Sequence, residues 1–190
     1  MSAAPLLSYR NVVAGYAQPV VGPVSFDLHE GDVVALVGPN GCGKSTLIGA
    51  LTGASRLISG EVVRGDGLSI AYQRQRPVRD TDVPIRGDEL LRLTRAGESE
   101  PPESLRPLLP LRVDRLSGGQ FQLLNVWACL GGEANLIVLD EPTNNMDPTA
   151  VRALTDLLQA SRRDRAILVV THDARFLTGV SARILEVESR

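Results

Sequence analysis

A glycine-rich loop between an apolar strand and an apolar helix is the feature that most constrains the fold of this 190-residue chain. The stretch VVALVGPNGCGKST contains an apolar run over 33–37, the pattern Gly38-x-x-x-x-Gly43-Lys44-Ser45, and the first apolar positions of a helix. Glycines let the backbone curl until its N–H groups point inward, and the helix that follows favours anions at its start. The strand, loop and helix together predict a P-loop, which binds phosphate groups.

The side chains of this loop have expected partners. Lys44 should reach the β and γ phosphates of a nucleotide, and the Ser45 hydroxyl should bind Mg²⁺, because this hard cation prefers oxygen ligands. A glycine turn with an incidental lysine is the alternative, and the strand and helix on either side disfavour it. The predicted phosphate-binding residues are Gly38, Pro39, Asn40, Gly41, Cys42, Gly43, Lys44, Ser45 and Thr46.

Two further apolar strands end in polar side chains. The strand within NLIVLDEPTNNMD ends in Asp140 and Glu141, and the strand within ILVVTHDARFL ends in His172. Beside a P-loop, Asp140 is expected to hold a water of the Mg²⁺ shell, and Glu141 to orient the water that attacks the γ-phosphate. Because parallel strands end at one edge of a sheet, we expect His172 to contact the γ-phosphate. The alternatives are a solvated turn for the two acids and a surface or core position for the histidine.

Apolar runs bounded by Gly, Pro and Asp predict the other elements. Strands are expected near 7–13, 24–28, 33–37, 61–63, 68–72, 136–139 and 166–171, helices at 85–95 and 148–160, and a proline-rich loop at 96–110. The predicted fold is α/β: a P-loop core with a mostly parallel sheet, N-terminal antiparallel strands and a small inserted helical subdomain. We expect one domain over 1–190, with the nucleotide-binding core at 1–76 and 134–190 and the helical subdomain at 77–133.

The sequence LSGGQ places two adjacent glycines, Gly118 and Gly119, where a helix should begin. An uncapped glycine pair is a poor helix opener, so this start is either an ordinary loop end or a backbone that another group approaches closely. Together with GPNGCGKST, IVLDEP, NNMD and VTHD, it completes an ordered set that resembles the motifs of nucleotide-binding subunits of ABC transporters. The resemblance covers most of the chain and implies ATP and Mg²⁺ as cofactors and ATP hydrolysis as the activity.

The resemblance also implies roles for residues outside the P-loop. Tyr16 stands where the family stacks an aromatic ring on adenine, and a half-buried tyrosine at a strand end is the alternative. Gln75, rather than Gln73, matches the family's spacing from Tyr72 for a glutamine that contacts Mg²⁺ and the attacking water. In family members the signature glycines bind the γ-phosphate held by a partner's P-loop, so a head-to-tail dimer of identical subunits is expected. The signature residues are Ser117, Gly118, Gly119 and Gln120.

The chain departs from the family pattern in its helical segment. The interval from Gln75 to Leu116 is short beside typical members, so the subdomain that docks on a permease should be trimmed. Leu123 and Ala128 occupy two positions that hold arginines in most members, and Trp127 makes this helix unusually apolar. Better burial against a smaller subdomain, or a surface for a special partner, would explain the change.

Composition limits the cellular context. The 20 basic and 22 acidic side chains nearly balance, so no global basic field indicates a nucleic-acid partner. The two cysteines, Cys42 and Cys129, have neither disulfide-scaffold nor zinc-site spacing. Neither a run of about 18 apolar residues nor a signal-peptide pattern is present. We therefore expect a cytoplasmic protein, held at the inner face of the cell membrane through a separate permease.

Two functions are compared on this basis. The first is the subunit whose ATP-driven dimerisation energises a permease, and AYQRQRPVRDTDVPIRGDELL resembles the corresponding segment of zinc and manganese importers. The second is a soluble, ribosome-associated ABC ATPase, which EPTNNMD and THDARFL resemble. Such proteins usually carry two cassettes and a charged linker, whereas this chain has one cassette and no such linker. This hypothesis therefore ranks second. A DNA-repair ATPase of related fold would need a coiled-coil insertion, and the sequence has no heptad run.

Overall fold

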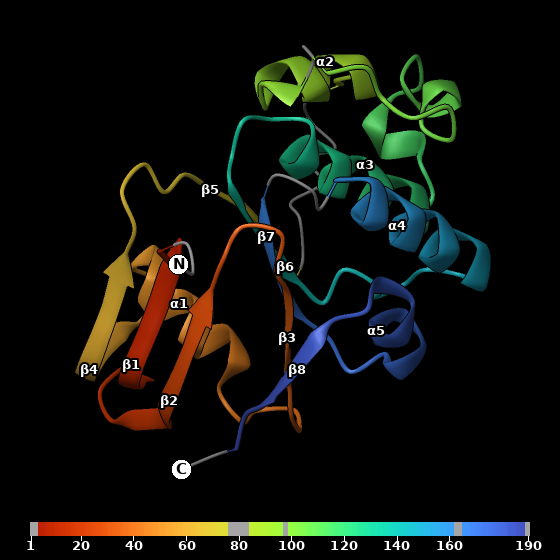
Figure 1. The fold of residues 1–190 in the computed structure, drawn as a ribbon. Helices are drawn as coiled ribbons and strands as arrows, with labels where there is room; N and C mark the ends of the chain where they lie inside the picture. The colour runs from red at the N-terminus through yellow and green to blue at the C-terminus, as the bar shows by residue number, and fades with distance from the viewer. Residues whose placement is uncertain (1–3, 76–83, 97–98, 162–164, 189–190) are drawn as a thin grey trace.

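The computed structural model describes residues 4–75, 84–96, 99–161 and 165–188 and contains two sheets, with helices packed around them (Figure 1). In chain order the elements are β1 (Leu7–Gly15), β2 (Pro19–Leu28), β3 (Val33–Val37), α1 (Lys44–Thr52), β4 (Arg56–Arg64), β5 (Ile70–Gln73), α2 (Gly87–Leu93), α3 (Gly118–Leu130), β6 (Leu136–Asp140), α4 (Pro148–Ser161), β7 (Ala166–Val170), α5 (Ala174–Val180) and β8 (Arg183–Glu186). Within the described ranges, no helix is both long and apolar enough to cross a membrane.

The N-terminal sheet has the order β2-β1-β4, and both of its strand pairs are antiparallel, as expected. Two of its strands are longer than the sequence indicates: β2 begins at Pro19 and β4 at Arg56. β4 is exposed along most of its length. Its side chains therefore lack the regular alternation of buried and exposed positions by which a half-buried strand is recognised.

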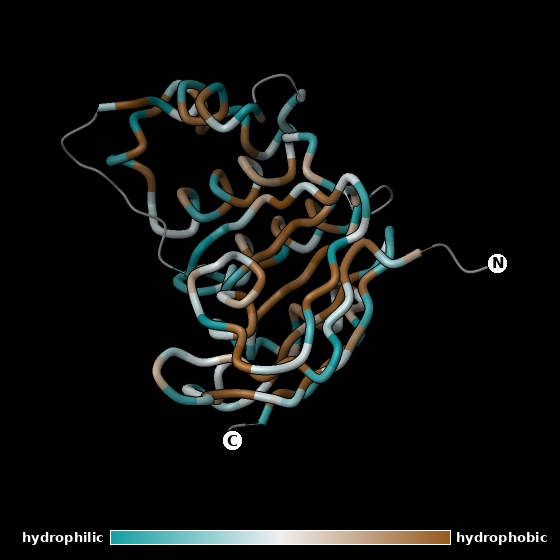
Figure 2. The backbone as a smooth tube through the Cα atoms, turned by 90° about the vertical axis from the view of Figure 1, so that its left-hand side faces the viewer, coloured by the Kyte–Doolittle hydropathy of each residue, from teal (hydrophilic) through white to brown (hydrophobic). Residues whose placement is uncertain are grey.

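The second sheet has the order β5-β6-β7-β3-β8, and all of its neighbouring strands are parallel. Its central strands are apolar on both sides and cross the middle of the molecule, where Figure 2 shows the hydrophobic colouring. This matches the predicted strand–helix–strand unit, β6-α4-β7. The edge strand β8 was not predicted, because its residues are mostly exposed and form no apolar run.

Alternate side chains of the parallel strands enter two separate cores. On one face, Val34, Leu36 and Val138 pack with α1 and with the antiparallel sheet. On the other face, Ile137 and Val169 pack with α3, α4 and α5. The helix that follows the P-loop is therefore held from both sides, by the antiparallel sheet and by the parallel one.

The helical segments between β5 and β6 lie together at one end of the molecule (Figure 1). α2 starts later than predicted because Arg86 is extended and forms a β-bridge with Arg112, next to a hydrogen bond from Val113 N to Ile85 O. The predicted loop at 96–110 contains a short 3₁₀ helix, Arg106–Leu108. The predicted boundary of the helical subdomain at 76–77 lies outside the described residues.

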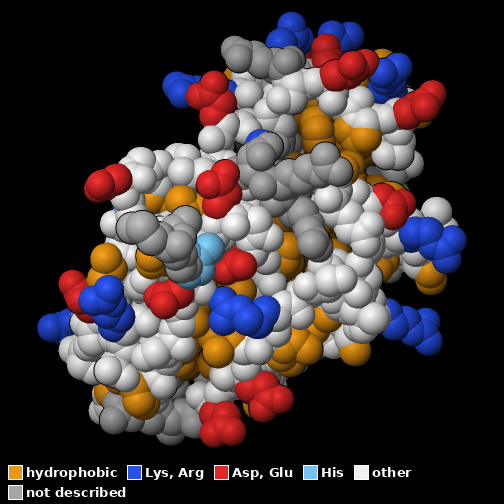
Figure 3. All heavy atoms as spheres, viewed as in Figure 1, with side chains coloured by type: hydrophobic (Ala, Val, Ile, Leu, Met, Phe, Trp, Pro, Cys, Tyr) orange, Lys and Arg blue, Asp and Glu red, His pale blue; other side chains and the backbone are white. Residues whose placement is uncertain are grey.

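The surface carries charges of both signs. The formal net charge is −2, and basic and acidic side chains are interspersed on the face in Figure 3. Long-range attraction of a polyanion needs an extended field of one sign. The described residues on this face do not form such a field.

The two-sided burial of the parallel sheet can be tested at Leu168, which lies in β7 and is 0% exposed. Leu168→Ala should lower the free energy of unfolding by about 2–5 kcal/mol, because it removes buried contacts and leaves a cavity. Leu93→Ala is the matched control: this leucine is 74% exposed, and its loss should change stability by less than about 0.5 kcal/mol. Urea denaturation followed by circular dichroism measures both, and equal effects would contradict the assigned core.

Candidate nucleotide site

The three strands that carry the predicted site are neighbours in the sheet. β7 lies between β6 and β3, and all three are parallel. In this register Val170 is paired with both Leu36 and Asp140. The P-loop, the two carboxylates and the segment of His172 therefore leave the sheet at the same edge, where ligands of open α/β sheets bind.

A cavity of about 290 Å³ lies at this edge. Its described lining residues are Val20, Asn40, Gly41, Gly43, Lys44, Ser45, Thr46, Gln75, Asp140, Glu141 and Val170. The P-loop, both carboxylates and Gln75 are thus brought together from distant parts of the chain. Gln73, the other glutamine considered, is 3% exposed at the end of β5 and is not among the described lining residues.

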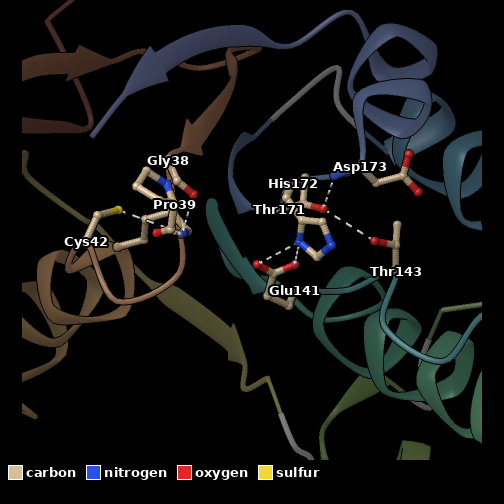
Figure 4. A network of polar contacts seen from close by, with 9 residues as sticks. Gly38, Pro39, Cys42, Glu141, Thr143, Thr171, His172 and Asp173 are labelled. Carbon is tan, nitrogen blue, oxygen red and sulfur yellow. Dashed lines mark hydrogen bonds and ion pairs between the residues drawn. The ribbon is translucent and has the colours of Figure 1, made fainter. Parts of the chain in front are cut away.

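Within the P-loop, the Lys44 ammonium group is held by the loop itself. Its Nζ donates to the carbonyl oxygens of Gly38 at 2.8 Å and Pro39 at 3.0 Å, and Cys42 lies beside them (Figure 4). Gly43 has φ 100°, and a Cβ there would lie 2.5 Å from the Val21 side chain, so this position requires glycine. No described side chain caps the start of α1. Its first N–H groups therefore suit an anion.

The Asp140 carboxylate is 3% exposed and only partly satisfied. Oδ2 accepts a hydrogen bond from the Tyr72 hydroxyl at 3.2 Å, whereas Oδ1 is buried without a partner among the residues that the structure describes. Burial raises the pKa of Asp140, and the neighbouring hydroxyls of Tyr72 and Ser45 oppose this shift. An unpartnered carboxylate oxygen near a serine hydroxyl fits a hard cation such as Mg²⁺.

Sequence reasoning missed the contact of Tyr72 with Asp140. Burial, followed by the neighbouring Asp140 carboxylate, raises the pKa of Tyr72 to about 12, so the phenol stays protonated and donates. The two residues are 68 positions apart and become neighbours because β5 pairs with β6. No local pattern marks such a pair.

The Glu141 carboxylate faces the His172 imidazole. Its side chain is 8% exposed, and the distance from His172 Nδ1 to Glu141 Oε2 is 3.2 Å (Figure 4). Glu141 has φ 50°, a left-handed backbone conformation that is costly for a residue with a side chain. Strained positions of this kind cluster at functional sites.

Tyr16 is 63% exposed, so it is not the half-buried tyrosine of the alternative reading. It follows β1 and does not belong to the described lining of the cavity.

The signature residues do not line the cavity either, within the part of the chain that the structure describes. The expectation of an uncapped start at this helix is wrong. Ser117 Oγ accepts from Gln120 N at 3.2 Å, and Gln120 Oε1 accepts from Ser117 N at 2.9 Å. This capping box brackets the two glycines, and its Ser-x-x-Gln spacing was visible in the sequence.

The two positions that lack the family's arginines have different surroundings. Leu123 is 8% exposed and belongs to the core beneath α3, which agrees with better burial as the reason for its apolar character. Ala128 instead lines a separate cavity of about 440 Å³ between β5 and α3, together with Ala71 and Thr94.

The fold and this edge define a class of protein. A P-loop after one parallel strand, two carboxylates at the end of a neighbouring strand, and one cavity common to both are the arrangement of a P-loop nucleoside triphosphatase. A family model described as ABC transporter matches residues 21–90. The zinc import ATP-binding protein ZnuC of Paracoccus denitrificans is 38% identical over 175 residues, which are 88% of this chain and 69% of that protein. The chain belongs to the ABC transporter family, as one of its ATP-binding subunits, and is an ATPase.

Solved structures agree with the α/β P-loop fold. An ATP-binding subunit of an ABC transporter has a TM-score of 0.79 at 25% identity, and the match covers 96% of this chain and 86% of that one. A chain from the complex of an archaeal ribosomal stalk protein and an archaeal ribosome recycling factor has a TM-score of 0.80 at 25% identity. That match covers 98% of this chain and 37% of the other. The ribosome-associated alternative therefore has less support than the transporter subunit.

The P-loop assignment can be tested at Lys44, which is the only lysine in the chain. Lys44→Ala should abolish measurable ATP binding in titration calorimetry with Mg²⁺ present, because the phosphate charge loses its cationic partner. Arg10→Ala, at an exposed position of β1, is the control and should bind ATP normally. In wild-type protein, ATP should also protect Lys44 from amine-directed methylation. Equal affinity of the Lys44 variant and the wild type would overturn the assignment.

Proposed function

We propose that this ATPase works with Mg²⁺ as a head-to-tail homodimer at the cytoplasmic face of the cell membrane, where it energises a separate permease that imports a divalent metal ion such as zinc. The proposal is carried by the cavity that brings Lys44, Ser45, Asp140 and Glu141 together. The cargo is inferred from the zinc import protein that the chain resembles.

Each side chain at the edge of the sheet has a proposed role. Lys44 neutralises the β and γ phosphates, and Ser45, Gln75 and Asp140 hold Mg²⁺, directly or through its water shell. When bound, Mg²⁺ would offset the charge that develops on the transferred phosphoryl group. Glu141 accepts a hydrogen bond from the attacking water and orients it.

His172 and Tyr16 complete the proposed set around one nucleotide. His172 contacts the γ-phosphate, which its position beside Glu141 supports. Tyr16 stacks on the adenine, for which its exposed ring is available.

The remaining contacts come from the second subunit. The signature residues lie at the start of α3, away from the described lining of this chain's own cavity. The capping box uses the N–H groups of Ser117 and Gln120, whereas the N–H groups of Gly118 and Gly119 belong to a helix start, which lacks intrahelical partners. We infer that these N–H groups bind the γ-phosphate held by the partner's P-loop.

The dimer is tested with Glu141→Gln, which should keep ATP and Mg²⁺ binding but stop hydrolysis. Trapped ATP should then hold two copies together, because one γ-phosphate contacts both. Light scattering should show a dimer with ATP and a monomer with ADP. Adding Ser117→Arg, which places a bulky side chain where the phosphate must approach, should restore the monomer while ATP still binds. Thermal melting is measured alongside, because this change also removes the cap of α3.

A monomer under all conditions, or a double variant that still dimerises on ATP, would contradict the trans contact of the glycines. An obligatory different partner subunit could also leave the Glu141→Gln protein monomeric. Mixing it with a membrane extract before sizing separates the two explanations.

The permease partner and the cargo are tested in the source cells. Tagged protein should capture a polytopic membrane protein from solubilised membranes, and cells lacking the gene should take up less zinc under zinc limitation. Capture of ribosomal proteins in place of a membrane protein would support the ribosome-associated alternative. Normal zinc uptake with a captured permease would reject zinc as the cargo but keep the transporter assignment.

A further inference from the structure

Thr171 lies between β7 and His172 and is completely buried, at 0% exposure. Its hydroxyl meets two different segments. It accepts a hydrogen bond from the backbone N–H of Asp173 at 3.1 Å and lies 3.3 Å from the hydroxyl of Thr143. Figure 4 shows both contacts converging on this one oxygen. Neither threonine is among the described residues that line the nucleotide cavity.

The contact with Asp173 determines the path of the chain beneath His172. A threonine hydroxyl that accepts from the N–H two residues later closes a compact turn, and His172 is the middle residue of this turn. The imidazole itself is 66% exposed, so packing against the protein does little to hold it. The direction in which the ring leaves the backbone depends instead on the turn.

The contact with Thr143 attaches the segment that carries Glu141. Thr143 follows Glu141 by two residues and is 9% exposed. The other end of this segment is attached by a hydrogen bond from Glu141 N to Val170 O at 2.7 Å. Two attachments to the end of β7 fix the orientation of a short segment, whereas one would leave it free to rotate.

We propose that Thr171 is a positioning residue which, with Thr143, holds the His172 imidazole against the Glu141 carboxylate. The proposal rests on the roles of Glu141 and His172 given above and adds residues that act through them. The buried Thr171 hydroxyl contacts both the turn that carries His172 and the segment that carries Glu141. Loss of this hydroxyl should separate the His172 and Glu141 side chains, while the residues proposed to bind phosphate and Mg²⁺ stay in place.

Three variants separate positioning from general stability. Thr171→Val removes the hydroxyl and keeps the branched shape, whereas Thr171→Ser keeps the hydroxyl and removes the methyl group. Thr155→Val is the matched control, because the Thr155 hydroxyl donates to Val151 O within α4, at 2.9 Å and outside the site. Thr171→Val should lower kcat about 10- to 100-fold, as expected for a displaced reactive group, with KM for ATP changed less than about twofold. Thr171→Ser and Thr155→Val should stay close to the wild type.

The ring position can be read without any turnover, because the chain has only two histidines, His29 and His172. In ¹⁵N spectra of the imidazoles, Thr171→Val should move the His172 signals toward those of a ring free in water and leave the His29 signals unchanged. Thr143→Val, which removes the cross-segment contact but leaves the turn, should shift His172 in the same direction by a smaller amount. Thr143→Val therefore tests the proposal even if Thr171→Val does not fold.

Unchanged His172 signals in folded Thr171→Val and Thr143→Val proteins would overturn the proposal. A loss of kcat in Thr155→Val as large as that in Thr171→Val would also overturn it. Since the spectra need neither ATP nor hydrolysis, an error in the proposed roles of Glu141 and His172 would appear differently. In that case Thr171→Val would shift His172 as expected, but kcat would not change.

Discussion

The register of three adjacent parallel strands is the constraint on which the site depends. Val170 of β7 is paired with Leu36 of β3 on one side and with Asp140 of β6 on the other. A slip of one residue in either pair would turn alternate side chains to the opposite core and move a carboxylate away from the P-loop. Because the strands are covered on both faces, burial of their apolar side chains opposes such a slip.

At this edge the protein buries charged groups and satisfies them unequally. Lys44 is 7% exposed and has two carbonyl partners from its own loop, whereas Asp140 has one hydroxyl donor and an oxygen without a partner among the described residues. Burying such groups is costly unless they are paired. The phosphates of a nucleotide and the Mg²⁺ proposed to accompany it would give these buried groups charged partners, so the same groups favour that ligand.

Much of the fold could be predicted because its signals are local. The apolar runs of β3, β6 and β7 and the helices α1, α3 and α4 lie where the sequence places them. The sequence did not indicate β8 or the full length of β4, since both lie at sheet edges with most side chains exposed. Arg86 shows a further limit: it forms an isolated β-bridge with Arg112, so α2 starts later than predicted, and this partner is distant in the sequence.

The sequence by itself determined the chemistry of each segment: the glycines and Lys44 of the P-loop, the acids at the end of β6, and the family to which the ordered motifs belong. These signals are readable because each depends on residues only a few positions apart. Only the tertiary structure decided which side chains meet. The Tyr72–Asp140 and Thr143–Thr171 contacts join residues 68 and 28 positions apart. They exist because strand register and the packing of two cores, neither of which is a local property, bring those particular atoms within hydrogen-bonding distance.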